Sequence, residues 1–209
     1  MKKFFTVIPL QIKGQLAVYH YAAVGNTKLE MEGKISFPIL TAINGYAEAG
    51  EDIRVIAVAT DVEATLENRK VFEAQVKELC TKKQIHLPNG VEYLLVPDDE
   101  RVSNHAATFQ KLIDYADDED ELFACITYGT KPLSMSLLMA VQYAYRIKQN
   151  TSISCIVYGA VDRSAPNREN WTGRVYDMTA LIQMDELVCL LAERKVPNPK
   201  RVIDQMLSL

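Results

Sequence analysis

The segment 127–132, with the sequence Thr-Tyr-Gly-Thr-Lys-Pro, combines residue types that bind phosphate where a strand passes into a helix. Glycine permits the tight turn, proline is favoured in the first turn of a helix, and the free N–H groups of a helix N-terminus attract anions. Lys131 would add a full positive charge beside those groups. The same pattern is typical of an ordinary strand-to-helix turn with a solvent-facing lysine, so the spacing alone leaves both interpretations open.

A second loop with similar residues is Gly25-Asn26-Thr27. It could face phosphate, or it could be a turn in which glycine and asparagine accept a positive φ. Neither loop matches the GxGxxG fingerprint of dinucleotide-binding folds or the Walker A sequence. The pattern therefore disfavours nicotinamide-dependent dehydrogenases and P-loop NTPases.

Other catalytic chemistry finds little support in the residue pattern. His20, His86 and His105 are far apart, and none has a histidine or carboxylate at metal-ligand spacing. The four cysteines form no CxxC pair, and the chain has no GxSxG nucleophile elbow. We therefore expect no metal site and no cofactor. We expect the cysteines to be reduced thiols, three of them inside apolar runs.

The composition limits the classes of partner. The formal net charge is −4, so no general basic field exists to hold duplex DNA or an anionic membrane, and an anionic ligand would need a local pocket. The first apolar run is short and lacks a signal-peptide cleavage site, and no stretch approaches the roughly 20 apolar residues of a membrane helix. Together with reduced cysteines, these features indicate a cytoplasmic protein.

Apolar runs of strand length alternate with longer segments of helical period along all 209 residues. We expect strands at 4–10, 16–22, 53–59, 91–96, 122–128 and 153–158. We expect helices at 36–49, 63–83, 104–115, 132–148, 179–194 and 199–207. The second strand would follow a turn at Lys13-Gly14, the acidic run 117–121 would be a solvated turn, and 162–174 would be a polar loop around Trp171.

The alternation predicts one α/β, Rossmann-like domain over 1–209, with a mostly parallel open sheet and helices on both faces. Its core would span 1–160, and the C-terminal loop and helices 161–209.

In such sheets ligands bind beyond the carboxyl ends of the strands, next to helix N-termini. Four loops are expected at that edge, one after each of four strands. Their residues form the candidate ligand-binding set: Gly25, Asn26, Thr27, Thr60, Tyr128, Gly129, Thr130, Lys131, Gly159 and Ala160.

Two segments carry a resemblance to a known family. The segments 126–132, Ile-Thr-Tyr-Gly-Thr-Lys-Pro, and 156–160, Ile-Val-Tyr-Gly-Ala, resemble strand ends of the CARF (CRISPR-associated Rossmann fold) proteins. The Phe37-Pro38 helix start, the 96–98 sequence Val-Pro-Asp and the 175–179 sequence Val-Tyr-Asp-Met-Thr fit the same pattern. In two respects the chain departs from the family: the 127–132 loop has no histidine, and Lys131 stands where arginine is more common.

The resemblance implies a homodimeric sensor of type III CRISPR antiviral defence. Family members bind cyclic oligoadenylate, a ring of four or six adenylates, across the two-fold axis over the carboxyl edges of both sheets. Many carry an effector nuclease, but this chain lacks the Arg-x4–6-His motif of HEPN ribonucleases. We therefore expect a stand-alone sensor that signals through a separate effector chain.

Two alternatives remain open from the sequence. The first is a metal-independent ring nuclease that cleaves the cyclic ligand. Lys131 would stabilise the developing charge in the transition state, and Thr130 or Thr27 would orient the sugar or phosphate. The second is an unrelated Rossmann-like nucleotide-binding enzyme.

Overall fold

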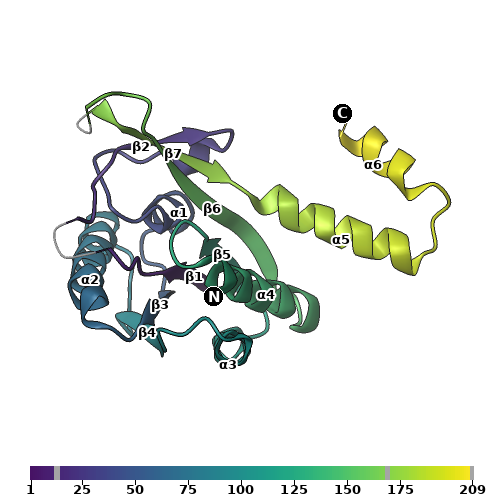
Figure 1. Ribbon diagram of the computed structural model, residues 1–209, viewed down its shortest axis with the longest axis horizontal. Helices are drawn as coiled ribbons and strands as arrows, with labels where there is room; N and C mark the ends of the chain where they lie inside the picture. Colours follow the sequence, from purple (N-terminus) through teal and green to yellow (C-terminus); the bar gives the residue numbers. More distant parts are fainter. Residues whose placement is uncertain (12–14, 168–169, 208–209) are drawn as a thin grey trace.

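The computed structural model describes residues 1–11, 15–167 and 170–207, which form a seven-stranded sheet with helices on both faces (Figure 1). The strands are β1 (Lys2–Val7), β2 (Tyr21–Val24), β3 (Ile53–Thr60), β4 (Val91–Val96), β5 (Glu121–Cys125), β6 (Ser152–Asp162) and β7 (Thr172–Asp177). The helices are the 3-10 turn η1 (Thr27–Leu29), α1 (Ile39–Tyr46), α2 (Glu63–Lys83), α3 (Val102–Ile113), α4 (Lys131–Ile147), α5 (Thr179–Glu193) and α6 (Pro199–Leu207).

The sheet has the order β2-β7-β6-β5-β1-β3-β4. Strands β4, β3, β1, β5 and β6 are mutually parallel, whereas β7 is antiparallel to β6 and β2 is parallel to β7. The last two strands therefore run against the other five. The predicted fold class, α/β with a mostly parallel Rossmann-like open sheet, is confirmed.

Strand β1 lies between β5 and β3 in the sheet, and helices cover both of its faces. Phe4 is fully buried and stacks on Phe123 of β5, with ring centroids 4.5 Å apart, on the face covered by α1 and α2. Phe5 is buried on the opposite face, which α3 and α4 cover. The unbroken apolar run in this part of the sequence thus reflects burial on both faces of a parallel sheet.

Three predicted elements have the expected bounds, namely α2, β4 and α6. The expected helix at 36–49 spans only Ile39–Tyr46, and Ser36 does not cap it. The N–H of Ser36 donates to Oε1 of Gln75 (3.0 Å), and its hydroxyl accepts from Nε2 of the same residue (3.3 Å). The fifth expected strand ends at Cys125, not at residue 128. The residues after it are consequently a loop at the carboxyl edge.

Two predictions about the sheet margin are wrong. The strand expected at 16–22 instead spans Tyr21–Val24. Tyr19 forms an isolated bridge to Ile35. The turn expected at Lys13-Gly14 lies outside the described residues, as do residues 168–169 of the expected polar loop. The end of that expected loop forms strand β7. Only one face of β7 is buried, so its sequence has no continuous apolar run that would predict a strand.

Helices α5 and α6 extend away from the sheet (Figure 1). Thr179 fixes the start of α5, since its hydroxyl accepts the N–H of Ile156 (2.8 Å) and donates to Asp177 (2.5 Å). Further along, Arg146 of α4 forms ion pairs with Asp185 and Glu186. Helix α6 has no buried residue.

One buried charge network joins the first strand to the acidic run. Lys3 is 1% exposed, and its Nζ lies 2.6 Å from Oδ2 of both Asp117 and Asp120. It also donates to the carbonyl of Tyr115 at 2.8 Å. Asp120 is itself buried, so the prediction of a fully solvated acidic turn is wrong at this position.

Replacing Lys3 by methionine should therefore destabilise the fold. Lys3→Met leaves the buried Asp120 without its main counter-charge, and we expect the free energy of unfolding to fall by about 3 kcal/mol in urea titrations. The matched control is Lys70→Met, because Lys70 is exposed and forms an ion pair with the half-exposed Glu67. That variant should lie within about 0.5 kcal/mol of wild type. Equal losses in the two variants would contradict the assignment.

Candidate functional site

The loop after β5 has the geometry that the sequence predicts for a tight strand-to-helix turn. Gly129 has a φ of +97°, and a Cβ at this position would lie 2.9 Å from Cγ1 of Val7. Only glycine avoids both the backbone strain and the clash. Helix α4 then begins at Lys131, with Pro132 in its first turn.

Lys131 is exposed at the start of α4. The N–H of Ser134 donates to the carbonyl of Thr130 (3.0 Å), so the N–H groups of Lys131 and Leu133 precede the helical hydrogen-bond ladder. The lysine charge and the positive end of the helix dipole therefore act at the same place. This arrangement favours a phosphate or another anion.

A small cavity of about 20 Å³ lies beside this turn and brings three predicted residues together, Thr60, Gly129 and Thr130. Oγ1 of Thr130 is buried there and has no hydrogen-bond partner among the described residues. His105, at the start of α3, lines the same cavity, and its Nε2 lies 3.2 Å from Oε2 of Glu100. A histidine oriented by a carboxylate can accept a proton from a bound hydroxyl group.

Sequence reasoning missed His105 and Glu100 as members of the site. The sequence did contain a signal for them. Because the strands are parallel, the loop after β4 reaches the same carboxyl edge as the loop after β5, so its residues are candidates for the same site. Asp98 and Asp99 also line the cavity. Carboxylates thus line the cavity and Lys131 does not, so a bound anion is favoured beside the lysine and not inside the cavity.

Tyr128 holds the loop in place. Its hydroxyl donates to the carbonyl of Ser36 at 2.6 Å, and its ring packs edge-on against Phe37. Burial raises the pKa of the Tyr128 hydroxyl well above its ordinary value, so this hydroxyl remains a donor at all physiological pH values. The predicted ligand-binding residue is therefore an anchor of the loop in this structure.

Gly159 is likewise a packing residue. It is buried, and its N–H donates to Oγ1 of Thr127 (2.7 Å). A Cβ here would lie 2.4 Å from Cγ of Pro38. Ala160 is partly exposed and lies in the part of β6 that continues beyond the end of β5, since Cys125 is paired with Val157.

Gly25-Asn26-Thr27 does not join the other predicted residues. Strand β2 runs against the central strands, and β7 and β6 lie between it and β5, the strand that leads to Lys131. Nδ2 of Asn26 donates to the hydroxyl of Tyr46 (2.8 Å) and to Asp177 (2.7 Å). Gly25 has a φ of +82°, in agreement with the alternative interpretation as a turn. The loop therefore lies apart from the cavity beside Thr130, and a role for it in ligand binding stays a prediction.

Neither a scan against protein-family models nor a search of curated proteins found a match to this chain. Among residues 1–11, 15–167 and 170–207, no three histidine, cysteine, aspartate or glutamate side chains cluster as metal ligands would. No helix in the same part of the chain has the length and apolar character needed to span a bilayer.

The anchoring role of Tyr128 can be measured by removing one oxygen atom. Tyr128→Phe leaves the buried carbonyl of Ser36 without this donor, and we expect the free energy of unfolding to fall by about 1–2 kcal/mol. Tyr158→Phe is the matched control, because that ring is 38% exposed on β6 and should tolerate the change. An unaltered urea midpoint for Tyr128→Phe would show that the hydrogen bond does not hold the loop.

Proposed function

We propose that this chain is a cytoplasmic, homodimeric sensor that binds cyclic oligoadenylate in type III CRISPR antiviral defence. The observation that carries the proposal is Lys131, exposed at the N-terminus of α4 immediately after the Gly129 turn. A phosphodiester there meets the lysine charge, the free N–H groups and the helix dipole together. The resemblance of 126–132 and 156–160 to CARF strand ends selects cyclic oligoadenylate as the ligand.

The charge distribution favours a dimer. One lysine beside the carboxylates of Asp98 and Asp99 is a weak site for a ring that carries several negative charges. On α4, Met135 and Met139 share the helix face of Lys131 and are 62% and 53% exposed. Burying these methionines between two copies would bring two Lys131 side chains to one symmetric ligand.

In this proposal the sensor passes its signal to a separate effector chain. Helix α5 offers a surface for this contact, since Leu181, Met184 and Val188 are spaced along one face and are 58%, 39% and 51% exposed. The position of α5 away from the sheet (Figure 1) leaves that face accessible.

Isothermal calorimetry with cyclic tetra- and hexa-adenylate tests the proposal. We expect one ring per dimer, and Lys131→Ala should weaken binding about tenfold or more, because it removes a charge-assisted contact in each subunit. The matched control is Lys77→Ala, which removes an exposed lysine from α2 on the opposite face and should leave the affinity unchanged.

Three results would contradict the sensor proposal. The first is no heat of binding with either ring at tens of micromolar, and the second is equal weakening by both substitutions. The third is a monomer that purifies with a bound adenine nucleotide, which would favour the unrelated Rossmann-like enzyme.

The placement of Thr130, His105 and Glu100 beside the Gly129 turn supports ring nuclease activity as a second candidate. In this reaction a ribose 2′-hydroxyl attacks the adjacent phosphorus, the bond to the 5′-oxygen breaks, and a 2′,3′-cyclic phosphate and a 5′-hydroxyl form. His105, oriented by Glu100, would accept the 2′-hydroxyl proton. Lys131 would stabilise the charge on the phosphoryl oxygens, and Thr130 would orient the ribose.

Incubation with the cyclic ligand in EDTA should give linear products with 2′,3′-cyclic phosphate ends. We expect His105→Gln to slow cleavage about a hundredfold while it retains the affinity for the ring, since a general base acts on the rate and not on binding. Lys131→Ala should lower both. If Lys131→Ala cleaves as fast as wild type, or if EDTA abolishes cleavage, this mechanism is wrong.

A further inference from the structure

Strand β2 leaves one margin of the sheet open. Among the described residues its only strand partner is β7, so the backbone groups on its other side have no strand neighbour. The strand has the sequence Tyr-Ala-Ala-Val and carries no charge and no proline, the residues that commonly protect such margins. The small side chains of Ala22 and Ala23 also leave the backbone approachable.

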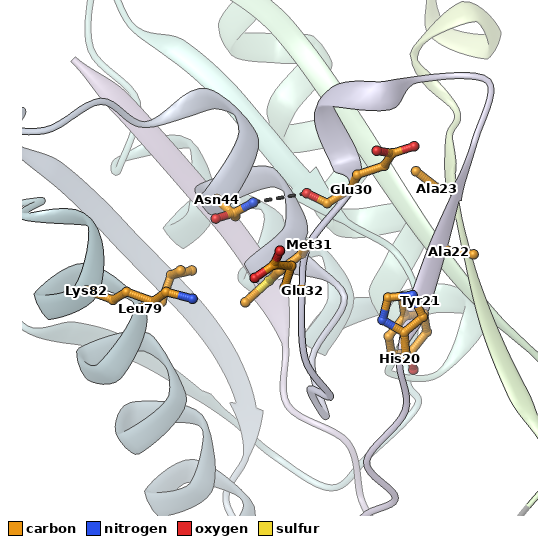
Figure 2. Close-up of a pocket in the computed structure, with 10 residues that line it drawn as sticks. All are labelled: His20, Tyr21, Ala22, Ala23, Glu30, Met31, Glu32, Asn44, Leu79 and Lys82. Atoms are coloured by element: carbon orange, nitrogen blue, oxygen red, sulfur yellow. Dashed lines mark hydrogen bonds between the residues drawn. The ribbon is translucent and has the colours of Figure 1, made fainter.

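A cavity of about 490 Å³ lies along this margin (Figure 2). It opens where two chain segments diverge: Tyr19 and Ile35 exchange backbone hydrogen bonds of 3.0 and 2.8 Å, and beyond them the chain of β2 separates from residues 30–32. Nδ2 of Asn44 donates to the carbonyl of Glu30 (3.0 Å), which fixes the wall opposite β2. The cavity thus has a free strand edge on one side and a braced segment on the other.

The wall opposite β2 is acidic. Glu30 and Glu32 are exposed in the cavity, and neither belongs to an ion pair found among the described residues. In Figure 2 the side chain of Glu30 extends toward Ala23 of β2. Lys82 of α2 lines the far side and balances one of the two carboxylates, so the lining keeps a net negative charge. Half-buried Met31 and buried Leu79 provide an apolar floor.

We propose that the β2 edge binds an extended peptide segment of a partner protein, with basic side chains at alternate positions, as an eighth strand of the sheet. The backbone of β2 supplies the hydrogen bonds of strand addition, and the carboxylates supply the selectivity. Alternate residues of a strand point to the same face, and Glu30 and Glu32 are also two residues apart.

Charge decides against two other occupants. A nucleic acid would place phosphates against Glu30 and Glu32. A second copy of this chain, paired through its own β2, would bring only Tyr-Ala-Ala-Val and no cation to those carboxylates. The site is also separate from Lys131, because β7 and β6 lie between β2 and the strand that leads to α4.

The experiment uses the full 209-residue chain and two labelled ten-residue peptides, one alternating lysine with valine and one alternating glutamate with valine. Fluorescence anisotropy should show binding of the lysine peptide that is at least tenfold tighter. Hydrogen exchange should show new protection of backbone amides within Tyr21–Val24. We expect Glu30→Gln combined with Glu32→Gln to weaken binding about fivefold or more, as expected for loss of two charge pairs. Glu78→Gln, an exposed change on α2 outside the cavity, should have no effect.

Each of four results would overturn the proposal. These are equal affinity for the two peptides, no binding of the lysine peptide up to millimolar concentration, binding without added protection in β2, and equal effects of the cavity variant and Glu78→Gln. Protection of β2 that instead rises with protein concentration, without peptide, would assign this edge to a second copy of the chain.

Discussion

The hydrogen bond from the Tyr128 hydroxyl to the Ser36 carbonyl ties the candidate site to the core of the protein. Tyr128 packs against the apolar clusters on both faces of the sheet, and its partner precedes α1 on one face while α4 follows on the other. The donor cannot ionise at ordinary pH because burial raises its pKa. The Gly129 turn and the start of α4 are positioned relative to this fixed point, and so is Lys131.

Charge at the carboxyl edge of the sheet is divided between a lysine and two aspartates. Lys131 and the helix dipole favour an anion beside the start of α4, whereas Asp98 and Asp99 oppose one inside the cavity. In the proposed dimer, a two-fold axis near α4 would double the favourable charge without adding a basic surface. The overall negative charge of the chain is compatible with a polyanionic ligand for this reason.

The reversal of direction at β7 has two consequences at the other side of the molecule. It turns β2 over, so Asn26 contacts Tyr46 and Asp177 and lies away from Lys131. It also makes β2 the last strand of the sheet, with an open backbone edge above the Glu30 and Glu32 wall. Because β7 forms a hairpin with β6, the Gly25-Asn26-Thr27 loop lies apart from the anion site. The same hairpin leaves the β2 edge, with its acidic wall, as the last margin of the sheet.

The sequence by itself determined the central strands, α2 and the Gly129-Thr130-Lys131 turn, because these depend on local pattern: apolar runs buried on both faces, helical period, and a glycine before a helix start. It did not reveal β7, whose Gly173 and Val175 are its only two buried residues. Nor could it show that Tyr128 and Gly159 serve packing, since Ser36 and Pro38 approach them from about 90 or more residues away. The direction of β2 and the meeting of His105 with Thr130 were decided only by the tertiary structure, because strand order and long-range contacts leave no periodic trace in the chain.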